Sequence, residues 1–418
     1  MKNLLCRAST VRHLVHCIGM ASLVLALMSC EENPSTPNLY DPSNTGGATP
    51  SVTSVSPADS AQAAIDTLII TGQNFSTVPS NNLVFLNASS GNVVAATATQ
   101  LTVTTPFVVG DSVSIAVAVQ GSSKLSNAIV YKLTAAVKTF GGLTVTELAY
   151  GLATDTSGNL YAAITASNLE AGILKITQSG ARSSYAPATA GTTKWNSIKM
   201  GPSNTMYAAR GVRALYSFPT NGGGSAAIWT ASFPGGISIT EFDFDAGKNI
   251  WAGGNTANIF QVQPNKTLTP FPFLGNVRSL RAYNGYLYFS ALTDSLSGRP
   301  ASELGEKIWR AQITGGGLGT PEVYFNFDQA YPGSSAFGIT FSSDGVLYIG
   351  TDAPGRIVVV LPNKTYSTPY ATYSALLGPA CYTFAWGKGD QLYVSGSNGA
   401  LARISVRGKQ SAPYYGGN

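Results

Sequence analysis

Histidine is almost absent from this sequence, which has two histidines in 418 residues. Both of them, His13 and His16, lie in an N-terminal segment that we expect to be cleaved off. The remaining chain would then have no imidazole group. It could build neither a histidine-based catalytic triad nor a histidine metal site, and it would lack the side chain that normally titrates near neutral pH.

The chain is also poor in cysteine and in charge. Of its four cysteines, Cys6 and Cys17 lie in the same N-terminal segment, so only Cys30 and Cys381 would remain. Two cysteines, one of which has another predicted role, cannot form a disulfide framework. Charged residues make up 11% of the sequence, while glycine is abundant at 45 residues. Low charge with many turn-forming residues predicts an all-β protein and argues against a disordered chain.

The formal net charge of +5 overstates the basic character of the chain. Lys2, Arg7 and Arg12 lie in the segment expected to be removed, which leaves 22 of the 25 basic residues against 20 acidic ones. A nucleic-acid partner would require a clustered basic surface. We therefore expect no nucleic-acid binding.

Residues 1–29 have the pattern of a signal peptide. Basic residues precede an apolar run from about Cys17 to Met28, and about a dozen apolar residues are too few to span a hydrocarbon core of about 30 Å. The run ends in Leu27-Met28-Ser29-Cys30, which resembles the lipobox of bacterial lipoproteins. The resemblance implies cleavage before Cys30 and acylation of its sulfur and its new amino group, which together give a stable membrane anchor. A plain signal peptide followed by a chance cysteine is the alternative.

The residues after Cys30 indicate where the anchored protein would lie. Glu31-Glu32 resemble the surface-export signal of Bacteroidetes-type lipoproteins, which implies a surface-exposed lipoprotein of the outer membrane in a bacterial cell envelope. Residues 30–50 are rich in Asn, Pro, Ser, Thr and Gly and lack apolar periodicity, so they predict a flexible tether after the lipidated cysteine. The membrane is then a partner of the protein through this lipid anchor.

Residues 51–134 predict a small β-sandwich, because short apolar or alternating runs recur about every ten residues with turn residues between them. The run from Ile69 to Phe75, which reads Ile-Ile-Thr-Gly-Gln-Asn-Phe, resembles the IPT/TIG domain, an immunoglobulin-like module. Asn74 and Phe75 could belong to a ligand site, but we favour a turn shaped by Gly72 and Asn74, with Phe75 in the core. The resemblance implies a spacer or docking module without catalytic function.

The rest of the chain is organised by a short pattern that occurs six times. A turn rich in Gly, Asn, Asp or Ser leads into an aliphatic residue that is followed by an aromatic one. The six pairs are Leu160-Tyr161, Met206-Tyr207, Ile250-Trp251, Leu287-Tyr288, Leu347-Tyr348 and Leu392-Tyr393. The aromatic residues lie 37 to 60 positions apart, and self-similarity at this period is typical of propellers and solenoids.

Each pair is surrounded by runs that predict four strands, so residues 137–415 predict a six-bladed β-propeller with four-stranded blades. The fragments Gly151–Tyr161 and Gly338–Tyr348 resemble the NHL repeat, which implies the same fold. A repeated sandwich or a β-helix is the rival, although the period is too long for β-helix rungs. Both Val137–Phe140 and Ser411–Tyr415 could supply the outer strand of the last blade, and the sequence does not choose between them.

One face of a propeller gathers the starts of the innermost strands and the loops between the second and third strands, and loops on a rigid scaffold commonly carry function. We therefore predict a ligand-binding face at Trp195, Asn196, Arg210, Glu241, Arg278, Phe337, Asp352 and Tyr382. Its aromatic side chains offer flat faces and its polar ones offer hydrogen bonds, a combination that suits sugar rings. Trp251 and Trp309 lie within predicted strands and are expected in the core.

Three functions remain open. The favoured one is non-catalytic binding of a glycan or protein ligand, because the sequence contains no catalytic motif. The second is a calcium-dependent hydrolase or lactonase, since six-bladed enzymes of this kind bind a divalent cation through Glu, Asn and Asp, and calcium prefers oxygen ligands. The third is a structural role in which the propeller docks another envelope protein. We assign no catalytic residue, no metal ligand and no cofactor, although the second function would require calcium.

Overall fold

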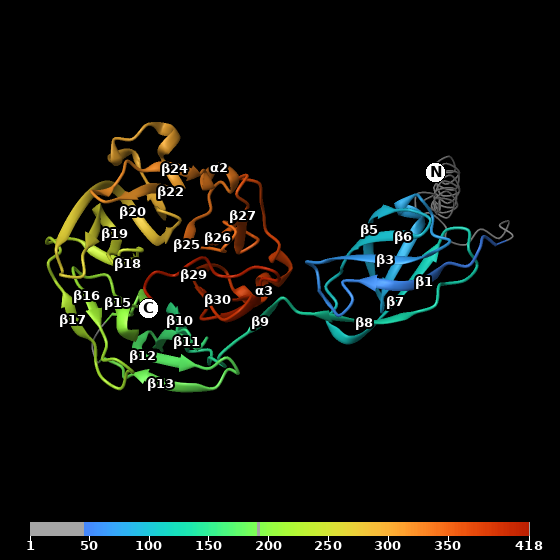
Figure 1. Ribbon diagram of the computed structural model, residues 1–418, viewed down its shortest axis with the longest axis horizontal. Coiled ribbons are helices and arrows are strands. Elements are labelled where there is room, and N and C mark those ends of the chain that lie inside the picture. The colour runs from blue at the N-terminus through green and yellow to red at the C-terminus, as the bar shows by residue number, and fades with distance from the viewer. Residues whose placement is uncertain (1–45, 190–192, 418) are drawn as a thin grey trace, which may run out of the picture. The chain divides into compact units, whose positions relative to one another are not determined.

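The computed structural model describes residues 46–189 and 193–417 (Figure 1). The predicted signal peptide, Cys30 and nearly all of the predicted tether lie outside the described residues. The chain divides into two compact units. One includes Leu68–Val103 and Ser114–Val130, and the other includes the chain from Tyr131 onwards together with Asp59–Thr67 and Thr104–Val113. Within the described ranges, no helix is long and apolar enough to cross a membrane.

The N-terminal strands pair in the order β1-β3-β6-β5-β4-β7-β8-β2. They are β1 (Ser51–Ser56), β2 (Ala61–Gln62), β3 (Thr67–Gln73), β4 (Asn82–Leu86), β5 (Ser89–Ala96), β6 (Gln100–Thr104), β7 (Gly110–Val119) and β8 (Ile129–Thr134). Burial alternates along β3 and β6, where Leu68, Ile70, Leu101 and Val103 are fully buried. Such alternation is expected for strands that turn one face toward a core, and it confirms the predicted all-β architecture of this part of the chain.

The second part of the chain has a propeller-like arrangement, with sheets placed around a centre (Figure 1). Its described residues form four sheets of four strands each and one sheet of seven strands. The first sheet contains β10 (Glu147–Thr154), β11 (Leu160–Ala166), β12 (Leu169–Ile176) and β13 (Arg182–Ala186). The second sheet contains β14 (Ser197–Met200), β15 (Met206–Ala209), β16 (Leu215–Ser217) and β17 (Ala227–Thr230). Another four-stranded sheet contains β25 (Ala336–Phe341), β26 (Leu347–Thr351), β27 (Ile357–Val360) and β28 (Tyr366–Ser367). The last sheet contains β29 (Cys381–Trp386), β30 (Gln391–Gly396), β31 (Leu401–Ser405) and β9 (Val137–Thr139).

The seven-stranded sheet corrects the expectation of six separate four-stranded blades. It contains β18 (Ser238–Phe244), β19 (Ile250–Val262), β20 (Leu268–Tyr283), β21 (Tyr286–Thr293), β22 (Gly305–Thr314), β23 (Gly317–Leu318) and β24 (Glu322–Phe325). The third and fourth repeats share this sheet because β20 pairs with β19 through its first half and with β21 through its second half. The chain thus passes from the outer strand of one repeat to the inner strand of the next without leaving the hydrogen-bonded ladder.

Two segments, Val137–Phe140 and Ser411–Tyr415, were predicted as the outer strand of the last blade, and the first of them closes the ring. Strand β9 pairs antiparallel with β31, with Val137 opposite Ile404 and Thr139 opposite Ala402. The last sheet therefore takes its outer strand from the start of the region, as many propellers do to tie their ends together. Ser411–Tyr415 is not that strand, since Ser411 instead forms a bridge with Ser342 at the end of β25.

The repeated pairs occupy equivalent places in the sheets. The aliphatic member of every pair is fully buried, and Trp251 has no exposed surface. The polar tip of the aromatic residue is used as well, because Trp251 Nε1 donates to Asp245 Oδ2 (2.8 Å) and Tyr161 Oη donates to Asp155 Oδ2 (3.1 Å). Each aspartate lies six residues before its aromatic partner, in the preceding turn. In these two repeats the turn and the aromatic residue therefore form one hydrogen-bonded unit. Trp251 and Trp309 are core residues as predicted.

Candidate functional site

A pocket of about 350 Å³ opens where the innermost strands begin. Its walls come from all five sheets, because each innermost strand starts at this end of the ring. Five of the eight predicted site residues line it, namely Asn196, Glu241, Arg278, Phe337 and Tyr382. They are joined by Tyr150, Lys194, Thr240, Asn276, Val277, Thr383 and Ser397. The structure thus brings together side chains that are up to 247 positions apart in the sequence, from Tyr150 to Ser397.

Aromatic rings and cations are paired around this pocket. The rings of Phe337 and Tyr382 meet edge to face, with centroids 4.9 Å apart and planes at 89°. The Arg278 guanidinium lies 5.3 Å from the Phe337 centroid, and Lys194 Nζ lies 3.7 Å from the Tyr150 centroid. Cation–π contacts of this kind hold both partners in place while leaving ring edges and N–H groups available. The pocket therefore presents fixed flat surfaces next to positive charge.

Many polar side chains at the pocket have no hydrogen-bond partner within the described part of the chain. Among the described residues, no hydrogen bond is formed by the side chains of Tyr150, Lys194, Asn196, Thr240, Asn276 and Tyr382. Polar groups that are partly shielded from water favour a ligand that can satisfy them. Two amides supply both donors and acceptors, two phenols and a hydroxyl supply either, and Lys194 supplies donors only. This set of free groups can hydrogen-bond a ligand rich in hydroxyl groups.

Glu241 forms the floor of the pocket. Its Oε1 accepts from Ser197 Oγ (2.6 Å) and from the Phe242 backbone N–H (3.0 Å), and it lies 3.5 Å from Lys199 Nζ. Burial raises the pKa of this carboxyl, an effect that the charge of Lys199 opposes. Within the described part of the chain, Oε2 has no hydrogen-bond partner, so it remains an acceptor for a ligand group.

Arg278 is held in the wall by a second ion pair. Its Nη2 lies 2.8 Å from Glu306 Oε1, and its Nη1 donates to the Ala336 carbonyl at 3.4 Å. Burial raises the pKa of Glu306, and the positive charge of Arg278 acts in the opposite direction. Because two of its nitrogens are already engaged, Arg278 acts mainly as a positioned cation that covers the ring of Phe337.

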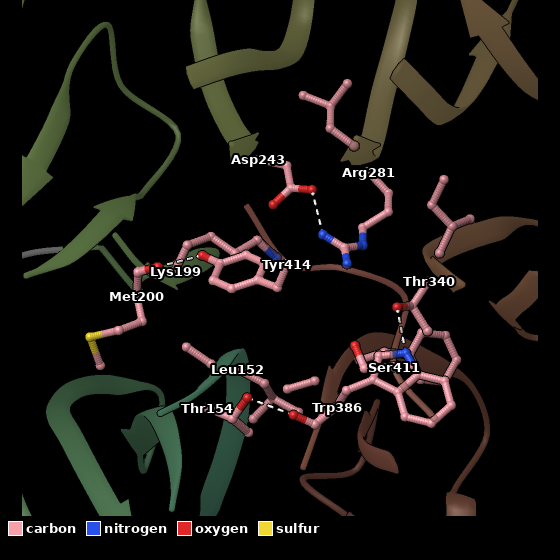
Figure 2. Close-up of a pocket in the computed structure, with 15 residues that line it drawn as sticks. Leu152, Thr154, Lys199, Met200, Asp243, Arg281, Thr340, Trp386, Ser411 and Tyr414 are labelled. Carbon is pink, nitrogen blue, oxygen red and sulfur yellow. Dashed lines mark hydrogen bonds and ion pairs between the residues drawn. The ribbon is translucent and has the colours of Figure 1, made fainter. Parts of the chain in front are cut away.

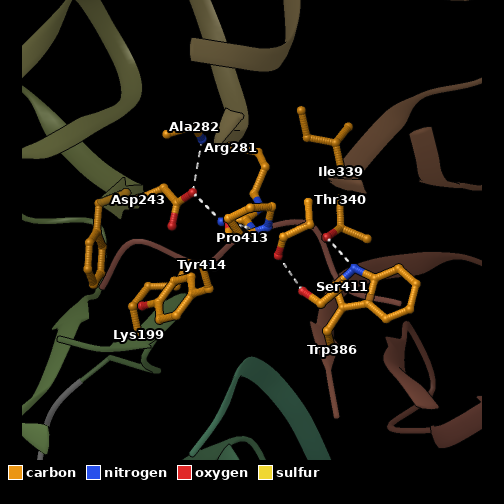
Figure 3. Close-up of polar contacts among 12 residues, drawn as sticks. Lys199, Asp243, Arg281, Ala282, Ile339, Thr340, Trp386, Ser411, Pro413 and Tyr414 are labelled. Carbon is orange, nitrogen blue, oxygen red and sulfur yellow. Dashed lines mark hydrogen bonds and ion pairs between the residues drawn. The ribbon is translucent and has the colours of Figure 1, made fainter. Parts of the chain in front are cut away.

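A smaller cavity of about 90 Å³ lies deeper along the centre (Figure 2). Lys199 lines this cavity while its partner Glu241 lines the outer pocket, so their ion pair stands between the two spaces. Arg281 Nη1 pairs with Asp243 Oδ2 at 3.0 Å, and the same oxygen accepts from the Ala282 N–H at 3.0 Å (Figure 3). Asp243 Oδ1 is buried and accepts no hydrogen bond from the residues that the structure describes. A cavity of this size beside an unsatisfied carboxylate oxygen suits ordered water.

The C-terminal segment closes the far end of this cavity. Tyr414 Oη donates to the Met200 carbonyl at 2.6 Å, and Arg281 Nη2 donates to the Pro413 carbonyl at 3.0 Å (Figures 2 and 3). The buried Ala412 donates its N–H to the Phe341 carbonyl at 3.1 Å. These contacts tie the segment to strands in three different sheets. The C-terminal segment therefore forms part of the wall of the smaller cavity.

Three predicted site residues lie outside the pocket. Trp195 is 2% exposed and packs edge to face against Tyr216 and Phe218, so its ring is not available for stacking. Arg210 covers the Trp195 ring at 4.6 Å and donates to Tyr216 Oη. Asp352 is exposed and accepts from the Ser335 N–H at 2.7 Å. We therefore leave these three residues out of the site proposed below.

Lys194 is the pocket residue that sequence reasoning missed most clearly. Successive side chains of an extended segment point to opposite sides. Since Lys194 and Asn196 line the pocket, Trp195 between them points into the core. Alternation along the extended segment just before β14 would have indicated Lys194 in place of Trp195. Thr240 and Asn276 carry no comparable signal, because short polar residues are common at every turn of this sequence.

The described side chains of the pocket are poorly suited to bind a metal ion. Among the described residues, no group of three or more His, Cys, Asp and Glu side chains is placed to hold a metal ion. The pocket residues whose oxygen atoms could best bind calcium would be Glu241, Asn196 and Asn276. Lys199 already balances the charge of Glu241, which weakens this set for a divalent cation.

Comparison with known proteins identifies the N-terminal domain. Residues 50–133 match the IPT/TIG domain family. These residues form an IPT/TIG domain. Within it, a Cβ at Gly72 would lie 1.9 Å from the Ser51 carbonyl oxygen, so this position requires glycine. Asn74 has a positive φ of 61° and Phe75 is 5% exposed, as expected for a turn residue and a core residue.

Two solved structures with TM-scores above 0.5 support the fold of this chain. A Bacteroides thetaiotaomicron protein described as a candidate phosphatase is 13% identical, covers 88% of this chain and 98% of its own, and gives a TM-score of 0.53. The luciferin-regenerating enzyme is 13% identical, covers 67% and 98%, and gives 0.51. An auxiliary nutrient binding protein from Bacteroides thetaiotaomicron is 11% identical, covers 87% and 98%, and gives 0.49. A comparison with curated protein sequences finds no match.

Proposed function

We propose that this chain is a lipid-anchored protein of the cell envelope whose propeller-like region binds a glycan without catalysis, in the pocket at the starts of the innermost strands. The observation that carries this proposal is the combination of the Phe337–Tyr382 ring pair with six polar side chains that have no hydrogen-bond partner among the described residues. Sugars offer apolar ring faces for contact with aromatic side chains and hydroxyl groups for hydrogen bonds. A concave, largely preformed pocket with a few convergent polar groups is typical of small-ligand sites.

The shape of the pocket favours a glycan over a protein ligand or an envelope-assembly partner. A protein partner of the usual kind needs a contact surface of about 800 Å² on each side, which is a broad and rather flat area. The pocket instead is a hollow of about 350 Å³ whose lining residues come from several strands. A loop or a chain end of a protein could enter it, so binding of an envelope protein but of no glycan would replace our proposal with the docking function.

The aromatic pair should determine affinity. We expect Tyr382→Ala to weaken glycan binding about tenfold, because an aromatic contact contributes about 0.5–1.5 kcal/mol beyond the area it buries. Tyr382 is 36% exposed, so its removal should leave the fold intact. Binding would be found on an array of neutral and acidic oligosaccharides and then measured by isothermal titration calorimetry. Tyr366→Ala is the matched control, since Tyr366 is another exposed tyrosine, on the outer strand β28.

Repeating this titration with calcium and after chelation separates binding from the calcium-dependent enzyme. Our proposal expects the same glycan affinity in both conditions. Stoichiometric calcium binding that disappears in Glu241→Gln would instead favour a hydrolase or lactonase, and lactones would then be tested as substrates. Binding to no oligosaccharide at millimolar concentration would overturn the glycan proposal.

The anchor has its own test. We expect the full chain to incorporate labelled palmitate in a bacterial host and to fractionate with membranes, and we expect Cys30→Ala to lose both properties, because two or more acyl chains are needed for stable anchoring. Cys381→Ala is the control, since Cys381 is buried and free. Label that persists in Cys30→Ala would show that the lipid lies elsewhere. Protease treatment of intact cells would then test whether the protein is on the outer surface.

We also propose that the seven-stranded sheet acts as two blades, which restores a six-bladed ring. Its halves begin with two different innermost strands, β18 and the second half of β20, and Glu241 and Arg278 reach the pocket from them. The two halves also contribute to separate core clusters, one around Phe260 and one around Trp309. An experimental map with six radial blades would support this count, and one with five would contradict it.

A further inference from the structure

We propose that the pocket selects a glycan that carries an anionic group, a sugar carboxylate or sulfate, and that Lys194 binds that group. The inference rests on the proposed function, because it specifies the chemistry of the glycan in the same pocket. Its basis is the placement of one cation that has no acidic partner beside the aromatic pair.

The charges around the pocket are paired with one exception. Arg278 pairs with Glu306 at 2.8 Å, and Lys199 pairs with Glu241 at 3.5 Å. Lys194 forms no ion pair with any described residue. The neighbouring residues 190–192, which the structure does not describe, are Ala, Gly and Thr and contain no acid. The pocket therefore carries one uncompensated positive charge.

The environment of Lys194 makes this charge useful to a ligand. Its side chain is half-buried, and burial lowers the pKa of the amino group. Lys194 Nζ lies 3.7 Å from the centroid of the Tyr150 ring, which contacts one side of the ammonium group. An ammonium group has three N–H donors. The remaining donors have no partner among the described residues. An anionic group of the ligand would replace the hydrogen bonds to water that the ammonium group has partly lost.

The rest of the pocket is arranged for a sugar that bears such a group. Tyr150 belongs to β10, and its carbonyl accepts from Ser395 Oγ of β30 at 3.3 Å, so the sheet that carries Tyr382 adjoins the Lys194–Tyr150 pair. A ring lying against Tyr382 could thus direct its anionic substituent toward Lys194. Glu241 Oε2 is a free acceptor at the floor, where it would repel an anion and favour a hydroxyl group. These two groups together orient an acidic sugar rather than a multiply charged anion.

Calorimetric titration of the purified protein with oligogalacturonate, and with the same oligomer after methyl esterification, tests the inference. We expect the acid to bind about tenfold more tightly than the ester, the difference that a hydrogen bond to a charged group typically makes. Lys194→Gln should abolish this preference and Lys194→Arg should keep most of it. Raising the salt concentration should weaken binding of the acid to the wild type more than to Lys194→Gln. Lys388→Gln is the control, since Lys388 is exposed in the turn after β29, at the other end of an innermost strand.

The outcomes separate this inference from the proposed function. Equal binding of acid and ester, unchanged in Lys194→Gln, would overturn the anionic preference while leaving glycan binding in place. Binding of neither oligomer, together with an empty array, would overturn the proposed function itself. Tighter binding of a sulfated oligosaccharide that is also lost in Lys194→Gln would support the inference with sulfate as the recognised group.

Discussion

Truncation after Gln410 is expected to lower the free energy of unfolding of the propeller-like region by about 5 kcal/mol, from the loss of a largely buried aromatic ring and of several hydrogen bonds. Tyr414 lines the inner cavity and donates to the Met200 carbonyl (Figure 2), and the Pro413 carbonyl accepts from Arg281. Lys248 Nζ donates to the Tyr415 carbonyl at 2.8 Å and also to that of Gly417. The truncated chain would open the cavity to solvent and leave these groups unpaired.

Urea-induced unfolding followed by tryptophan fluorescence measures this effect, because four of the five tryptophans, Trp195, Trp251, Trp309 and Trp386, are buried in the sheets of this region. Tyr414→Phe is the graded comparison, since it keeps the ring and removes one hydrogen bond, and it should cost about 1–2 kcal/mol. A truncated protein within 1 kcal/mol of the wild type would show that the C-terminal segment rests on the ring without stabilising it.

Arg281→Met should have the second largest effect, a loss of about 3–5 kcal/mol of unfolding free energy. The side chains of Asp243 and Arg281 are 1% and 9% exposed, so the substitution would leave Asp243 buried without its cation. Asp243 Oδ1 already lacks a protein partner, and the remaining Ala282 N–H cannot compensate for a full charge (Figure 3). The measurement is the same urea titration.

Two companion variants identify the origin of this loss. Arg281→Met combined with Asp243→Leu removes both charges and should recover most of the stability, as buried ion pairs often can be replaced by apolar residues. Arg310→Met removes an arginine from a more exposed pair with Glu322 and should cost about 1 kcal/mol or less. If the double variant is as unstable as Arg281→Met, lost packing rather than the unpaired charge is responsible.

The candidate site was predictable to the extent that it depends on where strands begin. Asn196, Glu241, Arg278, Phe337 and Tyr382 were found in this way, because in each repeat the segment before an innermost strand reaches the same end of the ring. Trp195 and Arg210 lie outside the pocket, because the Trp195 ring is buried in the core just before β14 and the Arg210 guanidinium packs over that ring. Lys194 could have been found from alternation, but its lack of an acidic partner depends on residues distant in the sequence.

What the sequence determined by itself is local. The aliphatic–aromatic pairs, the turns before them and the Gly72–Phe75 segment predicted the all-β architecture, the IPT/TIG domain and the propeller-like repeat, because these patterns act over about ten residues. The tertiary structure alone decided that β9 completes the last sheet, that β20 joins two repeats, and that the C-terminal segment closes the inner cavity. It also decided which charges are paired. Those outcomes depend on the order in which distant strands meet and on the burial that follows, and neither quantity is encoded in any short stretch of the chain.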